Sequence, residues 1–385
     1  MKKKLISMLL SATMVAALLS GCGGASGSGS ADAKASTAAP AADTAASTAA
    51  PAGDAAASTA APAADGAGAS GHTYAIVTKS AGNPYNEREA AGFQEVIEAA
   101  GGTCIVQNPE SATADAQISV IQSLISQGVD SIAIAANDAN ALASVCQEAI
   151  DAGIKVLTLD SDVNSAVRAT FCNQAGVQEV GQALVDAVYD LTGGEGQYAI
   201  LSATSQATNQ NAWIEAMKKI QEGDSKYSKL ELVEVAYGDD EPQKSTDQTQ
   251  ALLQNYPDLK VICAPTTVGI AAAAKVLQDQ GSAVKLTGLG LPSEMAEYIG
   301  ADDKHSCPYM FLWNPIDLGK LAGYASIALV DGKMTGAVGD SFEAGDMELS
   351  PYTLTELADG SGSEVILGPP FQFNPDNIAE WKEVY

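Results

Sequence analysis

Short apolar runs alternate along most of the chain with longer segments whose apolar residues recur at helical spacing. Residues 131–135 are an almost continuous apolar run, whereas Ile118, Ile121 and Leu124 share one face of a helix that ends before Gly128. Such runs predict buried strands, and the helical spacing predicts amphipathic helices. We expect strands over 73–78, 103–107, 131–135, 156–159, 198–202, 230–236, 261–264 and 285–288. We expect helices over 84–100, 114–127, 140–152, 176–191, 211–222, 244–255 and 268–280.

This alternation indicates an α/β protein. Repeated strand–helix units build parallel sheets that helices cover on both faces, and the strands of such sheets are apolar throughout. Residues 72–385 exceed the usual size of one domain, so we expect two doubly wound lobes.

Polar residues follow several predicted strands at the point where each strand ends. In open α/β sheets, ligands bind outside the carboxyl ends of the strands, so these residues are candidates for a binding site. They are Lys79, Asn83, Tyr85, Asn137, Asp138, Asp160, Asp162, Asn209, Gln210, Asn211, Pro265, Thr266 and Thr267.

These residue types suit a carbohydrate. Each sugar hydroxyl both donates and accepts hydrogen bonds, which amides, carboxylates and a lysine can satisfy. The apolar face of a pyranose ring packs on aromatic side chains, and Trp213 or Trp313 can supply one. Structural roles also fit, because Asp160 and Asp162 can cap a turn, residues 209–211 can cap a helix, and Trp313 can pack in a core or hinge.

The N-terminus has the pattern of a secretory signal. Lys2, Lys3 and Lys4 precede an apolar run over 5–19, which is shorter than the roughly 20 residues of a membrane helix. The following Leu-Ser-Gly-Cys resembles a bacterial lipobox, which implies cleavage of a signal peptide over 1–21 and lipidation of Cys22. A plain signal peptide with an incidental Cys22 is the alternative. Residues 22–71 are nearly all small, polar or Pro, which predicts a disordered tether.

Charge and cysteine content exclude several function classes. The net charge of −27 disfavours nucleic acid and anionic lipid as partners. The cysteines after Cys22 are scattered, and no Cys-x-x-Cys pair supports a metal site. We therefore expect no metal and no cofactor. The chain has only two histidines and lacks a Gly-x-Ser-x-Gly elbow after a predicted strand, so we expect a binding protein and not an enzyme such as a sugar hydrolase.

Several segments resemble the type I periplasmic sugar-binding proteins of ABC transporters, within which the L-rhamnose-binding lipoproteins and the related autoinducer-2 receptors are most similar. The segments are Lys79 to Tyr85, Leu157 to Asp162, Ala207 to Trp213, Ala264 to Gly269, Leu312 to Gly319 and Leu367 to Pro370. The resemblance implies two Rossmann-like lobes joined by a three-strand hinge, with the ligand in the cleft between them. It implies lobes of 72–174 plus 314–350 and of 175–313 plus 351–385.

The resemblance also implies ligand contacts. In autoinducer-2 receptors, the contact residues match Lys79, Asp160, Asn209, Gln210, Pro265 and Thr267. Asn209 stands where those receptors have an aspartate, and Thr267 where they have an alanine, which favours a deoxy sugar over autoinducer-2. We add Asn83, Tyr85, Asp162, Asn211 and Asn314 to the predicted ligand-binding set.

The function that the resemblance implies is capture of a monosaccharide, L-rhamnose or a similar deoxy sugar, for an ABC transporter permease. The protein would be a monomer, lipid-anchored on the outer face of the cytoplasmic membrane, at a Gram-positive-type cell surface or in a periplasm. A signalling receptor of the same fold, for autoinducer-2 or another sugar, is the alternative.

Overall fold

The computed structural model describes residues 69–385, which belong to one compact unit. The predicted signal peptide, Cys22 and the tether as far as residue 68 lie outside the described residues. In the described part of the chain, no helix is long and apolar enough to cross a membrane. The five cysteines within it are all free thiols.

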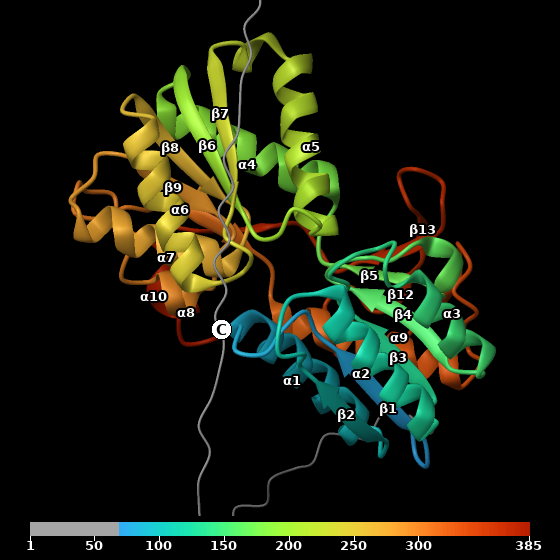
Figure 1. Cartoon of the computed structure of the whole chain (residues 1–385). Helices are drawn as coiled ribbons and strands as arrows, with labels where there is room; N and C mark the ends of the chain where they lie inside the picture. The colour runs from blue at the N-terminus through green and yellow to red at the C-terminus, as the bar shows by residue number, and fades with distance from the viewer. Residues whose placement is uncertain (1–68) are drawn as a thin grey trace, which may run out of the picture. The chain divides into compact units, whose positions relative to one another are not determined.

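The first sheet has seven strands in the order β13-β14-β5-β4-β3-β1-β2 (Figure 1). Its strands are β1 (Thr73–Val77), β2 (Thr103–Gln107), β3 (Ser131–Ile134), β4 (Lys155–Leu159), β5 (Phe171–Asn173), β13 (Thr355–Glu356) and β14 (Ser363–Ile366). All neighbours pair in parallel except β13 and β14. Two helix pairs pack on the sheet through separate apolar cores. They are α1 (Pro84–Ala99) with α9 (Pro315–Val330), and α2 (Ala114–Gln127) with α3 (Ala143–Asp151).

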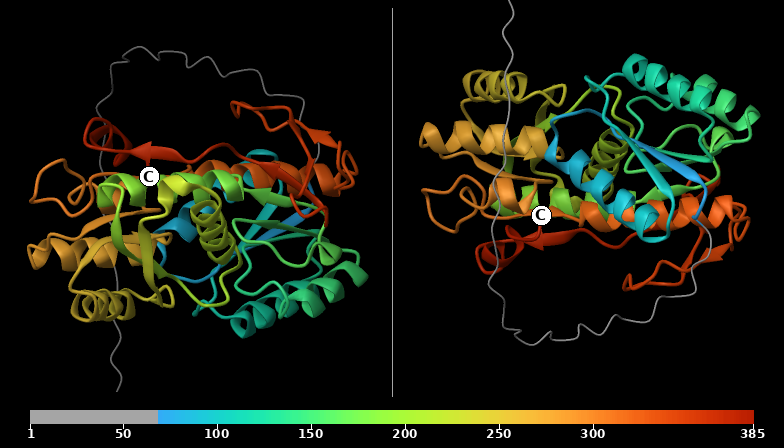
Figure 2. Two further views of the ribbon diagram at one scale, coloured as in Figure 1. Left: turned by 90° about the horizontal axis from the view of Figure 1, so that it is seen from above. Right: turned by 90° about the horizontal axis from the view of Figure 1, so that it is seen from below.

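Helices α1 and α9 lie side by side, as the blue and orange helices in Figure 2 show. Glycines permit this close approach: a Cβ added at Gly319 would lie 1.9 Å from the carbonyl oxygen of Glu89, and one at Gly92 would lie 2.0 Å from that of Ile316. The two helices therefore meet backbone to backbone.

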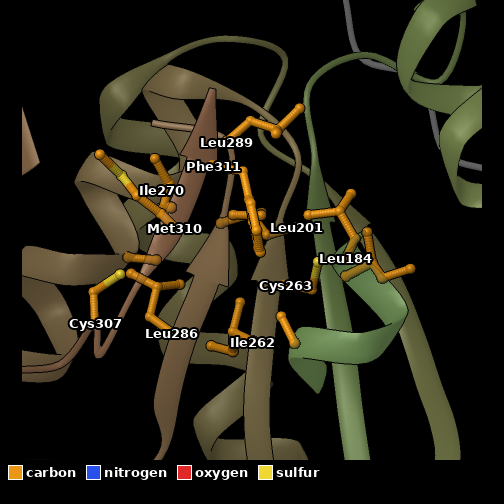
Figure 3. Packing of buried hydrophobic residues seen from close by; sticks show 14 of the residues in the cluster. Leu184, Leu201, Ile262, Cys263, Ile270, Leu286, Leu289, Cys307, Met310 and Phe311 are labelled. Atoms are coloured by element: carbon orange, nitrogen blue, oxygen red, sulfur yellow. The ribbon is translucent and has the colours of Figure 1, made fainter. Parts of the chain in front are cut away.

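The second sheet has four parallel strands in the order β7-β6-β8-β9. These are β6 (Gly196–Ser202), β7 (Leu230–Tyr237), β8 (Leu259–Ala264) and β9 (Lys285–Gly288). The helices around it are α4 (Val177–Thr192), α5 (Thr208–Gly223), α6 (Pro242–Asn255), α7 (Thr267–Asp279), α8 (Pro292–Met295) and α10 (Ile378–Trp381). Figure 3 shows Leu184, Leu201, Ile262 and Cys263 in the apolar core of this part, where they are fully buried.

Two short antiparallel pairs complete the fold. Strands β10 (Met310–Leu312) and β15 (Phe371–Phe373) pair beside β9, and β11 (Ser341–Phe342) pairs with β12 (Tyr352–Thr353). The α/β fold with two parallel sheets confirms the predicted fold class.

The chain passes between the two sheets three times: after β5, between β10 and α9, and between β14 and β15. The last passage corrects the predicted boundary at residue 351. Residues 364–366 pair in parallel with Phe171–Asn173 of β5, so the segment with β13 and β14 belongs to the first sheet. Pairing with the free edge of β5 satisfies backbone groups that would otherwise remain exposed.

Candidate ligand-binding site

The carboxyl ends of strands from both sheets meet around a cavity of about 40 Å³. The first sheet contributes residues after β1 and β4, and the second contributes residues after β6, β7, β8 and β9. The lining residues are Lys79, Asn83, Tyr85, Asn86, Asp160, Asn209, Gln210, Trp213, Asp240, Pro265, Thr266, Thr267, Leu289, Leu312 and Trp313.

Asp160 is the centre of the polar network in this cavity. Its carboxylate lies 2.7 Å from the Lys79 ammonium, and the two side chains are only 6 % and 10 % exposed. The hydroxyl of Tyr85 donates to Asp160 Oδ1 at 3.2 Å, and Gln174 Nε2 donates to the same oxygen at 3.4 Å. The backbone of Asp160 adopts φ 58°, a left-handed conformation that few residues other than Gly, Asn and Asp accept. The end of β4 thus turns sharply and directs a buried carboxylate into the cavity.

Asn209, in the first turn of α5, connects the second sheet to this network. Its amide Nδ2 donates to Asp160 Oδ2 at 3.2 Å, and its Oδ1 accepts from Lys79 Nζ at 3.3 Å. The neighbouring Gln210 accepts hydrogen bonds from Ser202 Oγ at 3.0 Å and from the Ala203 amide at 2.9 Å. Gln210 therefore fixes the first turn of α5 to the end of β6 and so positions Asn209.

Aromatic and aliphatic side chains form the other wall of the cavity. Trp313 Nε1 donates to the Tyr85 hydroxyl at 2.6 Å, and the ring centroids of Trp213 and Trp313 lie 5.6 Å apart. Burial, together with the nearby Asp160 charge, raises the pKa of Tyr85 well above its usual range. Tyr85 therefore remains neutral and serves as a hydrogen-bond donor to Asp160. Leu289 and Leu312 add apolar surface beside the two indoles.

A family comparison agrees with this arrangement. The model of the periplasmic binding protein domain matches residues 74–334. The chain belongs to the periplasmic binding protein family. This assignment confirms the resemblance drawn from the sequence, and it places the chain among solute-binding proteins and not among enzymes.

Solved structures and a curated relative show which solutes similar periplasmic binding proteins take. An ABC transporter solute-binding protein from Clostridium phytofermentas, solved with bound L-rhamnose, is 61 % identical, with a TM-score of 0.80 over 82 % of this chain and 99 % of that chain. The D-ribose/D-allose-binding protein of Pseudomonas aeruginosa is 27 % identical over 56 % of this chain and 69 % of its own length. LsrB from Clostridium saccharobutylicum, solved in complex with AI-2, is 24 % identical, with a TM-score of 0.73 over 80 % of this chain and 99 % of that chain, and it shows the shared fold.

Most of the side chains predicted from the sequence line this one cavity. They are Lys79, Asn83, Tyr85, Asp160, Asn209, Gln210, Pro265 and Thr267. Asn83 also caps α1, because its side chain accepts a hydrogen bond from the Tyr85 amide.

Three predicted residues have other partners. Asp162 accepts two hydrogen bonds from Arg168, at 2.6 and 2.8 Å, and lies at a neighbouring cavity of about 420 Å³. Asn211 donates to the Ser205 carbonyl oxygen at 2.9 Å. Asn314 caps α9 through the Ile316 amide. None of the three lines the 40 Å³ cavity, whereas Asp162 lines the neighbouring cavity together with Asp160, Asn209 and Trp213.

The sequence reasoning missed Asp240, which follows β7 and lines the cavity from the second sheet. The rule that ligands bind beyond the carboxyl ends of strands applies to β7 as well, so the signal was present. Leu289 and Leu312 were also missed, since apolar residues at a strand end do not differ in pattern from core residues.

Proposed function

We propose that this protein is the extracytoplasmic solute-binding lipoprotein of an ABC transporter, which captures L-rhamnose or a similar deoxy sugar and delivers it to the permease. The observation that carries the proposal is a cavity with a charged, amide-rich side and an apolar side, built from both sheets. The relative with bound L-rhamnose, at 61 % identity, supports the choice of sugar.

The polar side suits sugar hydroxyls. Asp160 offers acceptors, Lys79 offers donors, and the Asn209 amide offers both, so ring hydroxyls can be bound whichever way each one donates. These side chains are nearly shielded from water. In such surroundings, hydrogen bonds to charged groups each contribute about 1.5–3 kcal/mol. Such contacts give both affinity and stereochemical selection.

The apolar side suits the methyl group of a 6-deoxy sugar. Leu289, Leu312, Trp213 and Trp313 present carbon surface to the cavity, and the indole faces also suit the C–H face of a pyranose. A hydroxyl buried against this wall without a partner would cost roughly 1–3 kcal/mol. The wall therefore favours a sugar with carbon alone at position 6.

The proposed binding step includes closure of the two lobes around the ligand. The cavity that both sheets line measures about 40 Å³, below the roughly 300–1,000 Å³ of ligand pockets, and the adjoining cavity of about 420 Å³ shares Asp160, Asn209 and Trp213 with it. A sugar that contacts both lobes would favour the closed form through its differential affinity for that form. The closed form would then dock on the permease, while a lipid on Cys22 and the tether over 22–71 would hold the monomer at the membrane.

Calorimetric titration of the purified protein tests this proposal. We expect L-rhamnose to bind with micromolar or tighter Kd. L-Mannose, which adds only a 6-hydroxyl, should bind about 10-fold to 100-fold more weakly for the reason given above. L-Lyxose lacks the methyl carbon and should lose about 1 kcal/mol, a few-fold in Kd.

Ribose, galactose and autoinducer-2 complete the panel. Equal binding of L-rhamnose and L-mannose would contradict the role of the apolar wall. Binding of autoinducer-2 in place of any sugar would move the function to a signalling receptor of the same fold.

A further inference from the structure

We infer that Asp240 is a second sugar-binding carboxylate, supplied by the second lobe, which faces Lys79 together with Asp160 and restricts the site to neutral sugars. This inference rests on the proposed function and adds a specificity residue to it. The notable observation is the backbone at Asp240. Within residues 69–385, positive φ angles at residues other than glycine occur at Asp160 (58°), Asp239 (53°) and Asp240 (56°).

Two of these three aspartates line the same cavity, one from each sheet. A left-handed conformation costs a residue with a side chain roughly 1–2 kcal/mol, and it persists where the surroundings enforce it, often at functional sites. Asp160 already directs its carboxylate to Lys79 in this way. The same backbone feature recurs after β7 at Asp240.

The loop that carries Asp240 is held firmly. Gly238 and Asp239 donate their amides to Ser202 and Ala203 at the end of β6, both at 2.9 Å, and the Glu241 amide closes a turn to Gly238 at 2.9 Å. A Cβ at Gly238 would lie 2.1 Å from Ser245 Oγ, so α6 also packs tightly against the loop. The two strained residues are therefore fixed in place before any ligand arrives.

The two adjacent aspartates point in different directions. Asp239 is exposed and pairs with Lys244 on α6. Asp240 is partly buried, lines the cavity and accepts one hydrogen bond, from Thr266 Oγ1 at 2.8 Å. An ionised carboxylate has about four acceptor sites, so Asp240 can accept further hydrogen bonds from a ligand in the cavity that it lines.

Charge defines the ligand class that fits these acceptors. Burial raises the pKa of Asp240, and attraction to Lys79 opposes that rise. Lys79 is the only cation among the lining residues and already pairs with Asp160. Two carboxylates with one ammonium attract neutral hydroxyl donors and repel a sugar acid or sugar phosphate. A neutral sugar that donates to Asp160 and to Asp240 at once would also link the two lobes.

Asp240→Asn and Asp239→Asn form a matched pair of variants for the test. Asparagine accepts the left-handed conformation and has the shape of aspartate, so the loop is retained. Calorimetric titration with L-rhamnose should show at least a tenfold rise in Kd for Asp240→Asn and less than a twofold change for Asp239→Asn. Glycine also adopts the left-handed conformation, so Asp240→Gly should raise the Kd for L-rhamnose by at least as much as Asp240→Asn does.

The anion L-rhamnonate, the acid derived from the same sugar, provides the second readout. It should not bind the natural protein, and Asp240→Asn should narrow the gap in affinity between L-rhamnose and L-rhamnonate. If L-rhamnose binds the natural protein and both Asp240 variants equally, the inference is overturned while the proposed function stands. If the natural protein binds none of the sugars, the proposed function itself fails.

Discussion

Glu89 on α1 is a buried acid whose titration should be visible in the stability of the whole protein. Its side chain has no exposed surface, and neither carboxyl oxygen has a hydrogen-bond partner within the described residues. Burial raises the pKa of Glu89 well above its usual 4.5, the Asp160 charge raises it further, and Lys79 lowers it in part. The folded protein therefore holds this carboxyl in its neutral form well into the pH range where an exposed glutamate is ionised.

The sign of the pH dependence follows from that direction. A group whose pKa is higher in the folded state binds its proton more tightly there, so its favourable contribution is complete below the unfolded pKa and is lost as pH rises toward the folded pKa. Between these two values, the loss is about 1.4 kcal/mol per pH unit. Glu89→Gln keeps the shape of the neutral acid and does not titrate. As pH rises above about 4.5, the free energy of unfolding of Glu89→Gln should therefore increase relative to that of the natural protein. The difference between the two becomes constant above the pKa that Glu89 has in the folded protein.

Urea denaturation at constant ionic strength, at half-unit steps from pH 5 to pH 8, measures this difference. Glu98→Gln is the matched control, because Glu98 lies exposed on the same helix. The pH trend of the difference for Glu89→Gln should exceed that of the difference for Glu98→Gln. The reasoning would be refuted if the difference in free energy of unfolding between Glu89→Gln and the natural protein stayed constant from pH 5 to pH 8. Glu89 would then titrate as it does in the unfolded chain.

Three further predictions follow from the same contacts. Asp160→Ala should weaken L-rhamnose binding by at least about 1–2 kcal/mol in calorimetry, because it removes a charged acceptor from the cavity; an unchanged Kd would remove Asp160 from the site. Gly319→Ala should lower the free energy of unfolding by about 1–3 kcal/mol or more, since its Cβ would lie 1.9 Å from the Glu89 carbonyl oxygen. Gly223→Ala, at a helical glycine with nothing within 4 Å, is the control and should be neutral or slightly stabilising. Small-angle scattering should show a smaller radius of gyration with saturating L-rhamnose than without it, and no compaction would contradict lobe closure.

Much of the fold follows from the sequence because the central strands of both sheets, such as β3 and β8, are apolar on both faces. The strands from β1 to β4 and from β6 to β9 lie where the sequence predicts them, although Glu231 and Glu234 interrupt the apolar run of β7. The short strand β5 (Phe171–Asn173) was missed, because three residues do not establish a pattern. Helix α9 was missed for a different reason: it is buried on nearly all sides, so it lacks the polar face that gives a helix its periodicity.

The site was predictable because ligands of open α/β sheets bind beyond the carboxyl ends of the strands, and that rule selects the segments that line the cavity. The rule could not show which residues of one short segment contact Lys79 in the cavity and which have other partners. Asp160 and Asp162 both follow β4, yet the strained backbone directs Asp160 to Lys79, whereas Asp162 pairs with Arg168. That pairing depends on the position of Arg168 next to strand β14, a long-range feature that the local pattern does not contain.

The polar contacts between the lobes bear directly on affinity. Asn209 donates to Asp160 and accepts from Lys79, so each of these side chains already has a partner across the cavity. A sugar must replace these bonds, and its affinity reflects only the difference between the new contacts and the old ones. Asp240 differs in this respect, because within the described residues its carboxylate accepts from Thr266 of its own lobe, so no hydrogen bond between the lobes has to break there. Its contribution to affinity should therefore be larger, per hydrogen bond, than that of the more fully bonded Asn209.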